Sequence, residues 1–173
     1  YMQKYLVNSA DFTRPQATLI MTAALAVFML LQPVFGALSD RIGRRPLLIG
    51  FGLGGTLLTV PLFQAIGAAR SGGTAFLLVL GGLVIVSGYT SINAIVKAEL
   101  FPPHIRALGV ALPYAIANAL FGGSAEYVAL WLVKVGHESL FFYYVSGMCA
   151  LSLIAYWRMR ETALHGTMRN DPH

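Results

Sequence analysis

The chain has 173 residues, of which 57% are hydrophobic and only 11% are charged, and its formal net charge is +5. A soluble globular domain carries about 25% charged residues, so this composition excludes that class. The Lys and Arg residues fall between apolar segments rather than along one face, so the positive charge does not indicate a nucleic-acid-binding protein. We therefore expect an all-α, polytopic membrane protein.

Five apolar segments are long enough to cross the hydrocarbon core of a membrane as helices, which takes about 20 residues. In chain order we predict these spans at 17–38, 47–67, 74–96, 107–133 and 140–157, all within residues 8–157. Residues 1–7 are predicted to be the end of an earlier helix, and residues 158–173 a polar tail. The connections are short, so neighbouring helices should be antiparallel.

The connection at residues 36–46 reads GALSDRIGRRP and places Arg41, Arg44 and Arg45 between two spans. Lys and Arg are retained on the cytoplasmic side of a membrane, so this connection is predicted to be cytoplasmic. Alternation of the remaining connections then assigns eight basic residues to cytoplasmic segments and four to outer ones. The same alternation predicts a cytoplasmic C-terminus.

Polar side chains inside the predicted spans are candidates for a solute or proton site, because polar groups are costly in hydrocarbon. Glu126 is the only acidic residue well inside a span. Counting back by fours gives Gly122, Asn118 and Tyr114, which would share one helix face with it. This stripe predicts the lining of a polar cavity. The alternative is a protonated, hydrogen-bonded structural glutamate near the outer surface.

The third span carries a similar stripe of Tyr89, Asn93 and Lys97. Lys97 lies near the cytoplasmic end, where a lysine extends its ammonium group to the membrane surface, so we expect an interfacial role for it. Tyr89 and Asn93 stay candidates for contact with a solute.

Gln32 and Lys4 are two further candidates. Gln32 has four hydrogen-bonding sites, which serve either a solute or the carbonyl freed by the neighbouring Pro33. Lys4 lies in the short helix predicted at residues 1–7, where it either attracts an anionic solute or lies at the membrane interface.

Small residues recur at every fourth position in two spans, which favours close approach of helix backbones. These residues are Gly50 and Gly54 in the second span, and Ala111, Ala115, Ala119 and Gly123 in the fourth.

The sequence contains no motif of an enzyme or a metal protein. The four histidines fall in predicted connections or in the tail, and no pair has the spacing of metal ligands. Phosphate-loop, nucleophile-elbow and dinucleotide-binding patterns are not found. We predict no enzymatic activity, no cofactor and no metal.

Two loop motifs resemble those of the major facilitator superfamily. The first is GALSDRIGRRP, with its functional positions at Gly36, Asp40, Arg41, Gly43, Arg44 and Arg45. The second is an E-x-F-P-x-x-x-R-x-x-G pattern formed by Glu99, Phe101, Pro102, Arg106 and Gly109. The resemblance implies that these loops act as a conformational latch rather than as a solute site.

A closer resemblance is carried by YMQKYLVN, KAELFPPHIRALGVAL and ANALFGGSAEYVALWL. These segments are similar to the 2-oxoglutarate branch of the metabolite:proton symporter family, which implies proton-coupled symport of a dicarboxylate across the bacterial inner membrane. Related symporters for citrate, shikimate or betaine share the loop motifs, so another organic acid or a zwitterion is an alternative substrate.

The order of the motifs resembles the C-terminal half of such a transporter, from the end of the seventh helix to the twelfth. The resemblance therefore implies an N-terminal six-helix half of the same protein as a partner, besides membrane lipid, the organic acid and protons. The chain begins with Tyr1, which we interpret as part of a longer protein. A truncated half-transporter that does not transport is the alternative.

Overall fold

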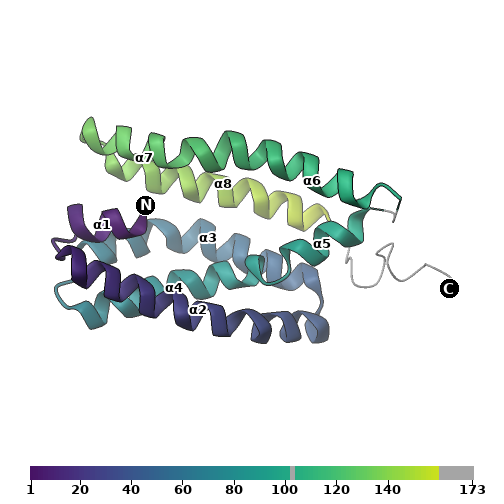
Figure 1. The fold of residues 1–173 in the computed structure, drawn as a ribbon, viewed down its shortest axis with the longest axis horizontal. Coiled ribbons are helices and arrows are strands. Elements are labelled where there is room, and N and C mark those ends of the chain that lie inside the picture. The colour runs from purple at the N-terminus through teal and green to yellow at the C-terminus, as the bar shows by residue number, and fades with distance from the viewer. Residues whose placement is uncertain (102–103, 160–173) are drawn as a thin grey trace.

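The structure is a computed structural model that describes residues 1–101 and 104–159, apart from the side chains of Leu100, Arg106 and Phe121. Within these residues the chain is all-α and contains no strand, which confirms the predicted fold class. The elements, drawn in Figure 1, are α1 (Met2–Asn8), α2 (Arg14–Ile42), α3 (Arg44–Gly67), α4 (Gly72–Thr90), α5 (Asn93–Leu100), α6 (Arg106–Ala117), the π-helix η1 (Asn118–Gly122), α7 (Gly123–Lys134) and α8 (Glu138–Arg158).

Five helical segments of the described chain are long and apolar enough to cross a membrane. They are Arg14–Ile42, Arg44–Gly67, Gly72–Glu99, Ala107–Lys134 and Glu138–Arg158. Each of the five predicted ranges lies inside one of these segments. The chain is therefore a multi-pass membrane protein, with α1 as an additional short helix.

The third span is broken at residues 91–92, whereas the sequence predicted one continuous helix over residues 74–96. Helix α4 ends at Thr90, and α5 begins at Asn93 and runs to Leu100, into the predicted connection. The Ser91 hydroxyl donates to the Ser87 carbonyl oxygen at 2.7 Å, and the Thr90 hydroxyl donates to the carbonyl of Val86 at 3.3 Å. Hydroxyl groups that bond to the preceding turn of a helix bend it.

The fourth span is interrupted by a π-helix, which sequence periodicity did not predict. The backbone N–H of Gly123 donates to the carbonyl of Asn118, five residues earlier. The Ser124 hydroxyl also bonds to the carbonyl of Leu120 in the same region. Single-turn π-helices inside α-helices are frequent at functional sites.

Glycines let α3 pack closely against its neighbours, although not at both predicted positions. A Cβ atom on Gly55 would lie 2.7 Å from the Sγ atom of Cys149 in α8, and one on Gly54 would lie 2.9 Å from Ile85 in α4. A Cβ atom on Gly50 would have nothing within 4 Å, so the predicted packing role of Gly50 is wrong. Gly55, which was not predicted, takes that role because it faces α8.

The small-residue stripe of the fourth span has no such role within the described residues. Ala111, Ala115 and Ala119 are exposed, and a Cβ atom on Gly123 would meet nothing within 4 Å. The α6–η1 segment contacts few other elements, so its small residues face open space rather than a helix backbone.

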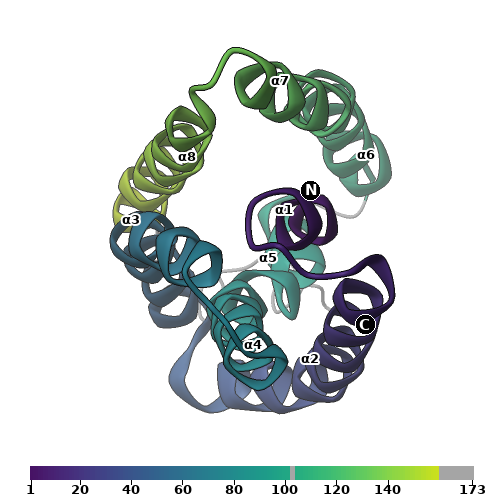
Figure 2. The same cartoon turned by 90° about the vertical axis from the view of Figure 1, so that its left-hand side faces the viewer.

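Seen end-on, the long helices form a ring, and α1 and α5 lie on its inner side (Figure 2). Figure 1 places α1 and α5 near opposite ends of the bundle, which we call the α1 end and the α5 end. At the α1 end, Leu6 is fully buried, and the rings of Phe63 and Phe142 stack with centroids 4.6 Å apart. This cluster anchors α1 against α3 and α8.

Candidate functional site

A pocket of about 460 Å³ lies between α4, α5, α6, η1 and α8, and we call it the polar pocket. Its polar lining residues are Tyr89, Lys97, Tyr114 and Asn118. These residues come from both of the polar stripes that the sequence indicated. No Asp or Glu is among the described residues that line it, so its only formal charge there is the Lys97 ammonium group.

Lys97 lines the polar pocket. Its Nζ atom lies 4.1 Å from the centroid of the Tyr114 ring, which is the geometry of a cation–π contact. Helix α5 continues to Leu100, so Lys97 is still on a helix that faces α6. The sequence did not predict this contact, and the interfacial role of Lys97 stays a prediction.

Tyr89 and Asn93, predicted on one face, are separated by the break between α4 and α5. Tyr89 lines the polar pocket, and its ring is stacked on Phe51 with centroids 5.1 Å apart. Asn93 begins α5 and is not among the lining residues. The prediction of a shared face fails for Asn93 because the turn at residues 91–92 ends the register of α4.

Asn118 and Gly122 belong to η1, and both line the polar pocket. A Cβ atom on Gly122 would lie 3.6 Å from the Oδ1 atom of Asn118, so the amide packs over the glycine. Glu126 does not line this pocket. The π-helix adds a residue to the turn, so counting by fours from Tyr114 does not lead to Glu126 on the same face.

Gln32 cross-links α2 to α4. Its Oε1 atom accepts from the Thr90 hydroxyl at 2.9 Å, and its Nε2 atom donates to the Ser87 hydroxyl at 3.3 Å. Nε2 also donates to the carbonyl of Phe28, whereas the carbonyl that Pro33 leaves free is four residues before it, at position 29. The interpretation of Gln32 as a cap for that carbonyl is therefore wrong.

Lys4 and Glu126 form an ion pair at the α1 end. The Nζ atom of Lys4 lies 2.5 Å from the Oε1 atom of Glu126, and both side chains are 53% exposed. Lys4 and Glu126 were predicted as separate candidates. Opposite charges in apolar helices tend to pair with each other, and this rule could have identified the contact.

A second glutamate also attaches α1 to the bundle, through neutral donors. The Tyr1 hydroxyl donates to Glu138 Oε1 at 2.8 Å, and the Ser9 hydroxyl donates to its Oε2 at 2.7 Å. Glu138 lies in the first turn of α8, where a negative charge is favourable at the helix N-terminus. This contact was not predicted, since no local sequence pattern marks it.

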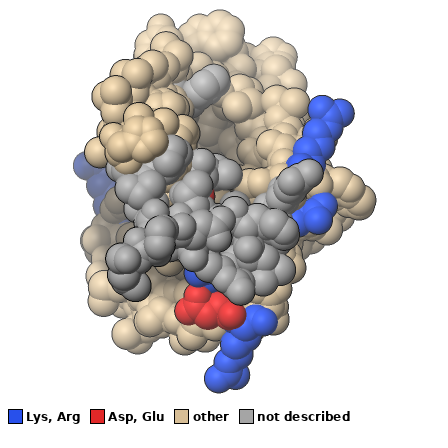
Figure 3. Space-filling view, turned by 90° about the vertical axis from the view of Figure 1, so that its right-hand side faces the viewer, with Lys and Arg blue, Asp and Glu red and all other residues tan. Residues whose placement is uncertain are grey.

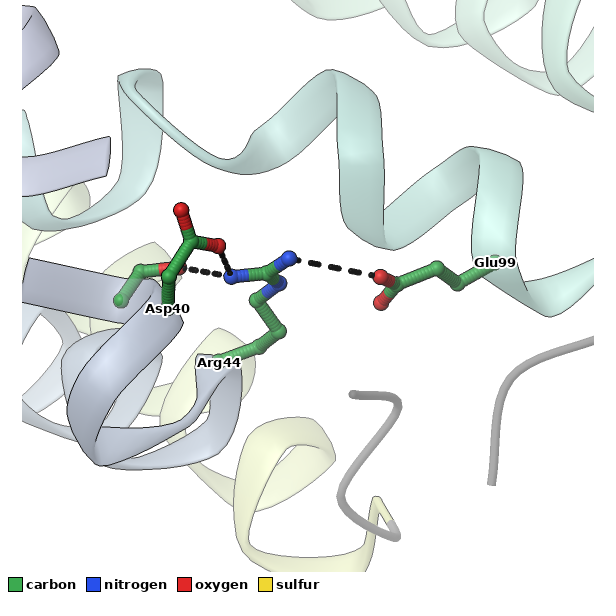
Figure 4. A network of polar contacts seen from close by, with 4 residues as sticks. Asp40, Arg44 and Glu99 are labelled. Atoms are coloured by element: carbon green, nitrogen blue, oxygen red, sulfur yellow. Dashed lines mark hydrogen bonds and ion pairs between the residues drawn. The ribbon is translucent and has the colours of Figure 1, made fainter. Parts of the chain in front are cut away.

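At the α5 end, Arg44 lies between two carboxylates and joins the two loop motifs (Figure 4). Its Nη1 atom donates to Asp40 Oδ1 at 2.5 Å and to the Ser39 hydroxyl at 2.6 Å. Its Nη2 atom lies 3.6 Å from Glu99 Oε1, and the side chains of Arg44 and Glu99 are 11% and 9% exposed. The network connects the α2–α3 turn to α5. We call Asp40, Arg44 and Glu99 the arginine network.

Other residues of the first motif shape the same turn. Gly43 has φ 96° and ψ 164°, a conformation that is open to glycine and strained for other residues. Arg45 donates to the carbonyl of Trp157 at 2.6 Å, near the C-terminus of α8. Arg41 is exposed in the last turn of α2, and a Cβ atom on Gly36 would meet nothing within 4 Å. Lys and Arg side chains project from this end of the molecule in Figure 3.

In the second motif, the structure explains Gly109. A Cβ atom at this position would lie 2.6 Å from the ring of Phe101, so glycine lets α6 pack against that ring. Pro102 and the side chain of Arg106 lie outside the described residues. Glu99 contacts Arg44 of the first motif.

No group of three or more His, Cys, Asp or Glu residues that could hold a metal ion is found in the described part of the chain. The Lys, Tyr and Asn side chains of these sites can donate hydrogen bonds to an anion, and the Glu side chains can accept a proton.

Comparison with known proteins identifies the family. The family model described as Major Facilitator Superfamily matches residues 1–170, so the chain belongs to this superfamily. It is 55% identical over 154 residues to the alpha-ketoglutarate permease of Escherichia coli, an alignment that covers 89% of this chain and 36% of that protein. It thus spans about a third of the length of the curated relatives it matches. No solved structure matches significantly.

Two other relatives show the range of the family. The chain is 33% identical over 103 residues to the citrate-proton symporter of Salmonella typhi, covering 60% of this chain and 24% of that protein. It is 31% identical over 168 residues to the proline/betaine transporter of Escherichia coli, covering 94% of this chain and 32% of that protein.

Proposed function

We propose that this member of the major facilitator superfamily acts as the C-terminal half of a proton-coupled symporter for a small dicarboxylate such as 2-oxoglutarate. One observation carries the proposal: the polar pocket has a cation, Lys97, and no acid among its described lining residues. An anionic solute finds there a charge that is not already neutralised. The name of the 55% identical permease supports the same substrate.

The polar pocket supplies the donors that a carboxylate requires. The Lys97 ammonium group donates charge-assisted hydrogen bonds, and the hydroxyls of Tyr89 and Tyr114 and the amide of Asn118 donate neutral ones. A quaternary ammonium zwitterion would place its cation near Lys97, which is unfavourable. Another organic acid stays the nearest alternative, and the citrate-proton symporter among the relatives supports it.

We assign α1 to the end of the seventh helix of the transporter, and the five long spans to the eighth to twelfth helices. The α5 end faces the cytoplasm in this proposal, because Arg41, Arg44, Arg45 and Arg158 lie there. The protein would be in the bacterial inner membrane with its C-terminus in the cytoplasm. A cysteine at Ser71, in a Cys149→Ala background, should then be labelled from outside.

Transport requires that the two six-helix halves rock around a central site. In our proposal the arginine network is the latch of this cycle, because it ties the α2–α3 turn to α5 in one conformation. Glu126 is the proposed proton site, since it is an acidic residue within a span and its partner is a charge. Gln32 stabilises the helix pair behind the polar pocket and does not contact the solute.

The test is uptake of labelled 2-oxoglutarate by vesicles that contain the full-length protein, with and without an inward proton gradient. We expect accumulation only with the gradient. Lys97→Gln should raise KM for 2-oxoglutarate about tenfold, which corresponds to about 1.4 kcal/mol of lost binding free energy. Lys134→Gln is the matched control, because this lysine lies in the last turn of α7 and outside the polar pocket.

Two outcomes would contradict the proposal. Accumulation of glycine betaine in preference to 2-oxoglutarate would make the substrate a zwitterion. No uptake of any organic acid by the full-length protein would reject the symporter.

A further inference from the structure

We propose that Lys4 forms a second anion site at the α1 end, and that Glu126 occupies this site as an internal carboxylate until a solute carboxylate replaces it. The inference rests on the proposed function, because it takes the solute to be an organic acid. It adds a binding residue, Lys4, and a competitor for that residue, Glu126.

The geometry of the ion pair is that of a lysine with a bound carboxylate. The Nζ–Oε1 distance is 2.5 Å, within the range of a charge-assisted hydrogen bond. About half of each side chain is exposed at the surface of this chain, so the described helices do not cover the ammonium group. In a site that water reaches, such an ion pair contributes little to stability, and exchanging one carboxylate for another costs little.

Helix α1 is held in place without the ion pair, so Lys4 stays where it is when Glu126 leaves. The Tyr5 hydroxyl donates to the carbonyl of Phe63 at 2.8 Å, and Glu138 accepts from Tyr1 and Ser9. These contacts join α1 to α3 and α8. A site that stays ordered without its internal carboxylate can accept an external one.

The Lys4 site and the polar pocket are separate. Tyr114, which is under Lys97, and Glu126, which is bound to Lys4, are 12 residues apart on one span. At 1.5 Å per residue this is about 18 Å along the helix axis, more than half of the ~30 Å hydrocarbon core. A small dicarboxylate does not reach both lysines at once. It would therefore bind to the two sites in succession.

The charges around Glu126 make this exchange sensitive to protons. The described charged side chain that acts on its carboxylate is the Lys4 ammonium group, from α1. A proton on Glu126 removes the negative charge that holds Lys4 and leaves Lys4 open to a solute carboxylate. By linkage, a carboxylate bound to Lys4 favours a proton on Glu126 to the same extent. Proton and anion thus bind together.

The test is equilibrium binding of 2-oxoglutarate to the purified full-length protein, in a Lys97→Gln background that weakens the polar pocket. Glu126→Gln should lower the Kd of the remaining binding at least threefold at neutral pH and flatten its pH dependence. Lys4→Gln should raise that Kd at least tenfold, with or without Glu126→Gln. Asp11→Asn is the control and should leave the Kd and its pH dependence unchanged, because this exposed acid lies outside the helices and does not hold α1.

Two results would overturn the Lys4 site. Either Lys4→Gln leaves the remaining Kd unchanged, or Glu126→Gln weakens binding as much as Lys4→Gln does, which is the behaviour of a purely structural ion pair. The same titrations with citrate separate this result from failure of the proposed function. If the protein does not bind 2-oxoglutarate but binds citrate in a Lys4-dependent way, only the proposed substrate is rejected. If it binds no carboxylate, both proposals are rejected.

Discussion

The two ends of the bundle each have an ion pair that joins separate helices, and the two pairs lie in opposite environments. At the α1 end, Lys4 and Glu126 are 2.5 Å apart and half exposed. At the α5 end, Arg44 and Glu99 are 3.6 Å apart, and about a tenth of each side chain is exposed. The shorter contact is therefore the more accessible one.

This difference separates two roles for charge in a membrane protein. Removing one partner of a buried pair leaves an uncompensated charge in a medium of low dielectric constant, so such a pair favours one conformation strongly. An exposed pair exchanges its partners with water and solutes at little cost. We expect the α5 end to control stability and conformation, and the α1 end to control binding.

The largest expected effect is on stability at the α5 end. Glu99→Gln removes a buried carboxylate from the side of the buried Arg44 and leaves the contact with the more exposed Asp40 in place. We expect the free energy of unfolding to fall by about 3 kcal/mol, measured by thermal or chemical denaturation in detergent. Asp11→Asn, an exposed acid outside the helices, is the control and should change it little. Equal effects of the two substitutions would remove the contrast between the two ends.

Close packing at the α5 end gives the next largest effect. Gly109→Ala places a Cβ atom 2.6 Å from the Phe101 ring, so the ring or α6 has to move. We expect a loss of about 2 kcal/mol in the free energy of unfolding, which is typical of overpacking. Gly123→Ala, where a Cβ atom has nothing within 4 Å, is the matched control. If Gly109→Ala left the free energy of unfolding unchanged, α6 would be free to shift.

A smaller effect is expected for the exposed member of the arginine network. The side chain of Asp40 is 67% exposed, so Asp40→Asn should cost at most about 1 kcal/mol in stability. The transport rate should fall, because the α2–α3 turn loses a contact that holds one conformation. Equilibrium binding of 2-oxoglutarate to the outward-open state should stay close to that of the unchanged protein. A large loss of this binding, with normal exchange between conformations, would contradict the latch role.

The smallest effect on stability is expected at the α1 end. Lys4→Gln should lower the free energy of unfolding by only about 0.5 kcal/mol, because the pair is exposed and α1 has other contacts. For Lys4→Gln we therefore expect weakened binding of the solute carboxylate together with nearly unchanged stability. A loss of stability similar to that of Glu99→Gln would make Lys4 a structural residue.

The fold class and the spans could be predicted from the sequence because they depend on composition and length alone. The polar pocket was predicted in part: Tyr89, Tyr114, Asn118 and Gly122 line it, although Lys97, expected at the interface, is its cation. The break at residues 91–92 and the π-helix depend on local hydrogen bonds that hydrophobic periodicity does not reveal.

Contacts between distant segments were the least predictable part of the site. Lys4 and Glu126 are 122 residues apart, and the Tyr1–Glu138 contact spans 137 residues. Such a pairing depends on how the helices are arranged around the ring, and the sequence of one span contains no information on which helix lies beside it. The Arg44–Glu99 contact was missed for the same reason, although the motif resemblance had indicated both residues.

The π-helix has a consequence for the rotational phase of the fourth span. An α-helix turns by about 100° per residue, so one additional residue in a turn rotates everything after it by roughly that angle relative to what comes before. Asn118–Gly122 therefore uncouples the direction of Tyr114 from that of Glu126, although the two belong to one span. Deleting Ala119 would restore a continuous α-helix and turn Glu126 away from Lys4, while Lys97 and Tyr114 stayed together. Shortening the chain by one residue, with no change in any charged group, would thus be enough to separate Glu126 from Lys4 and to leave the contact between Lys97 and Tyr114 intact.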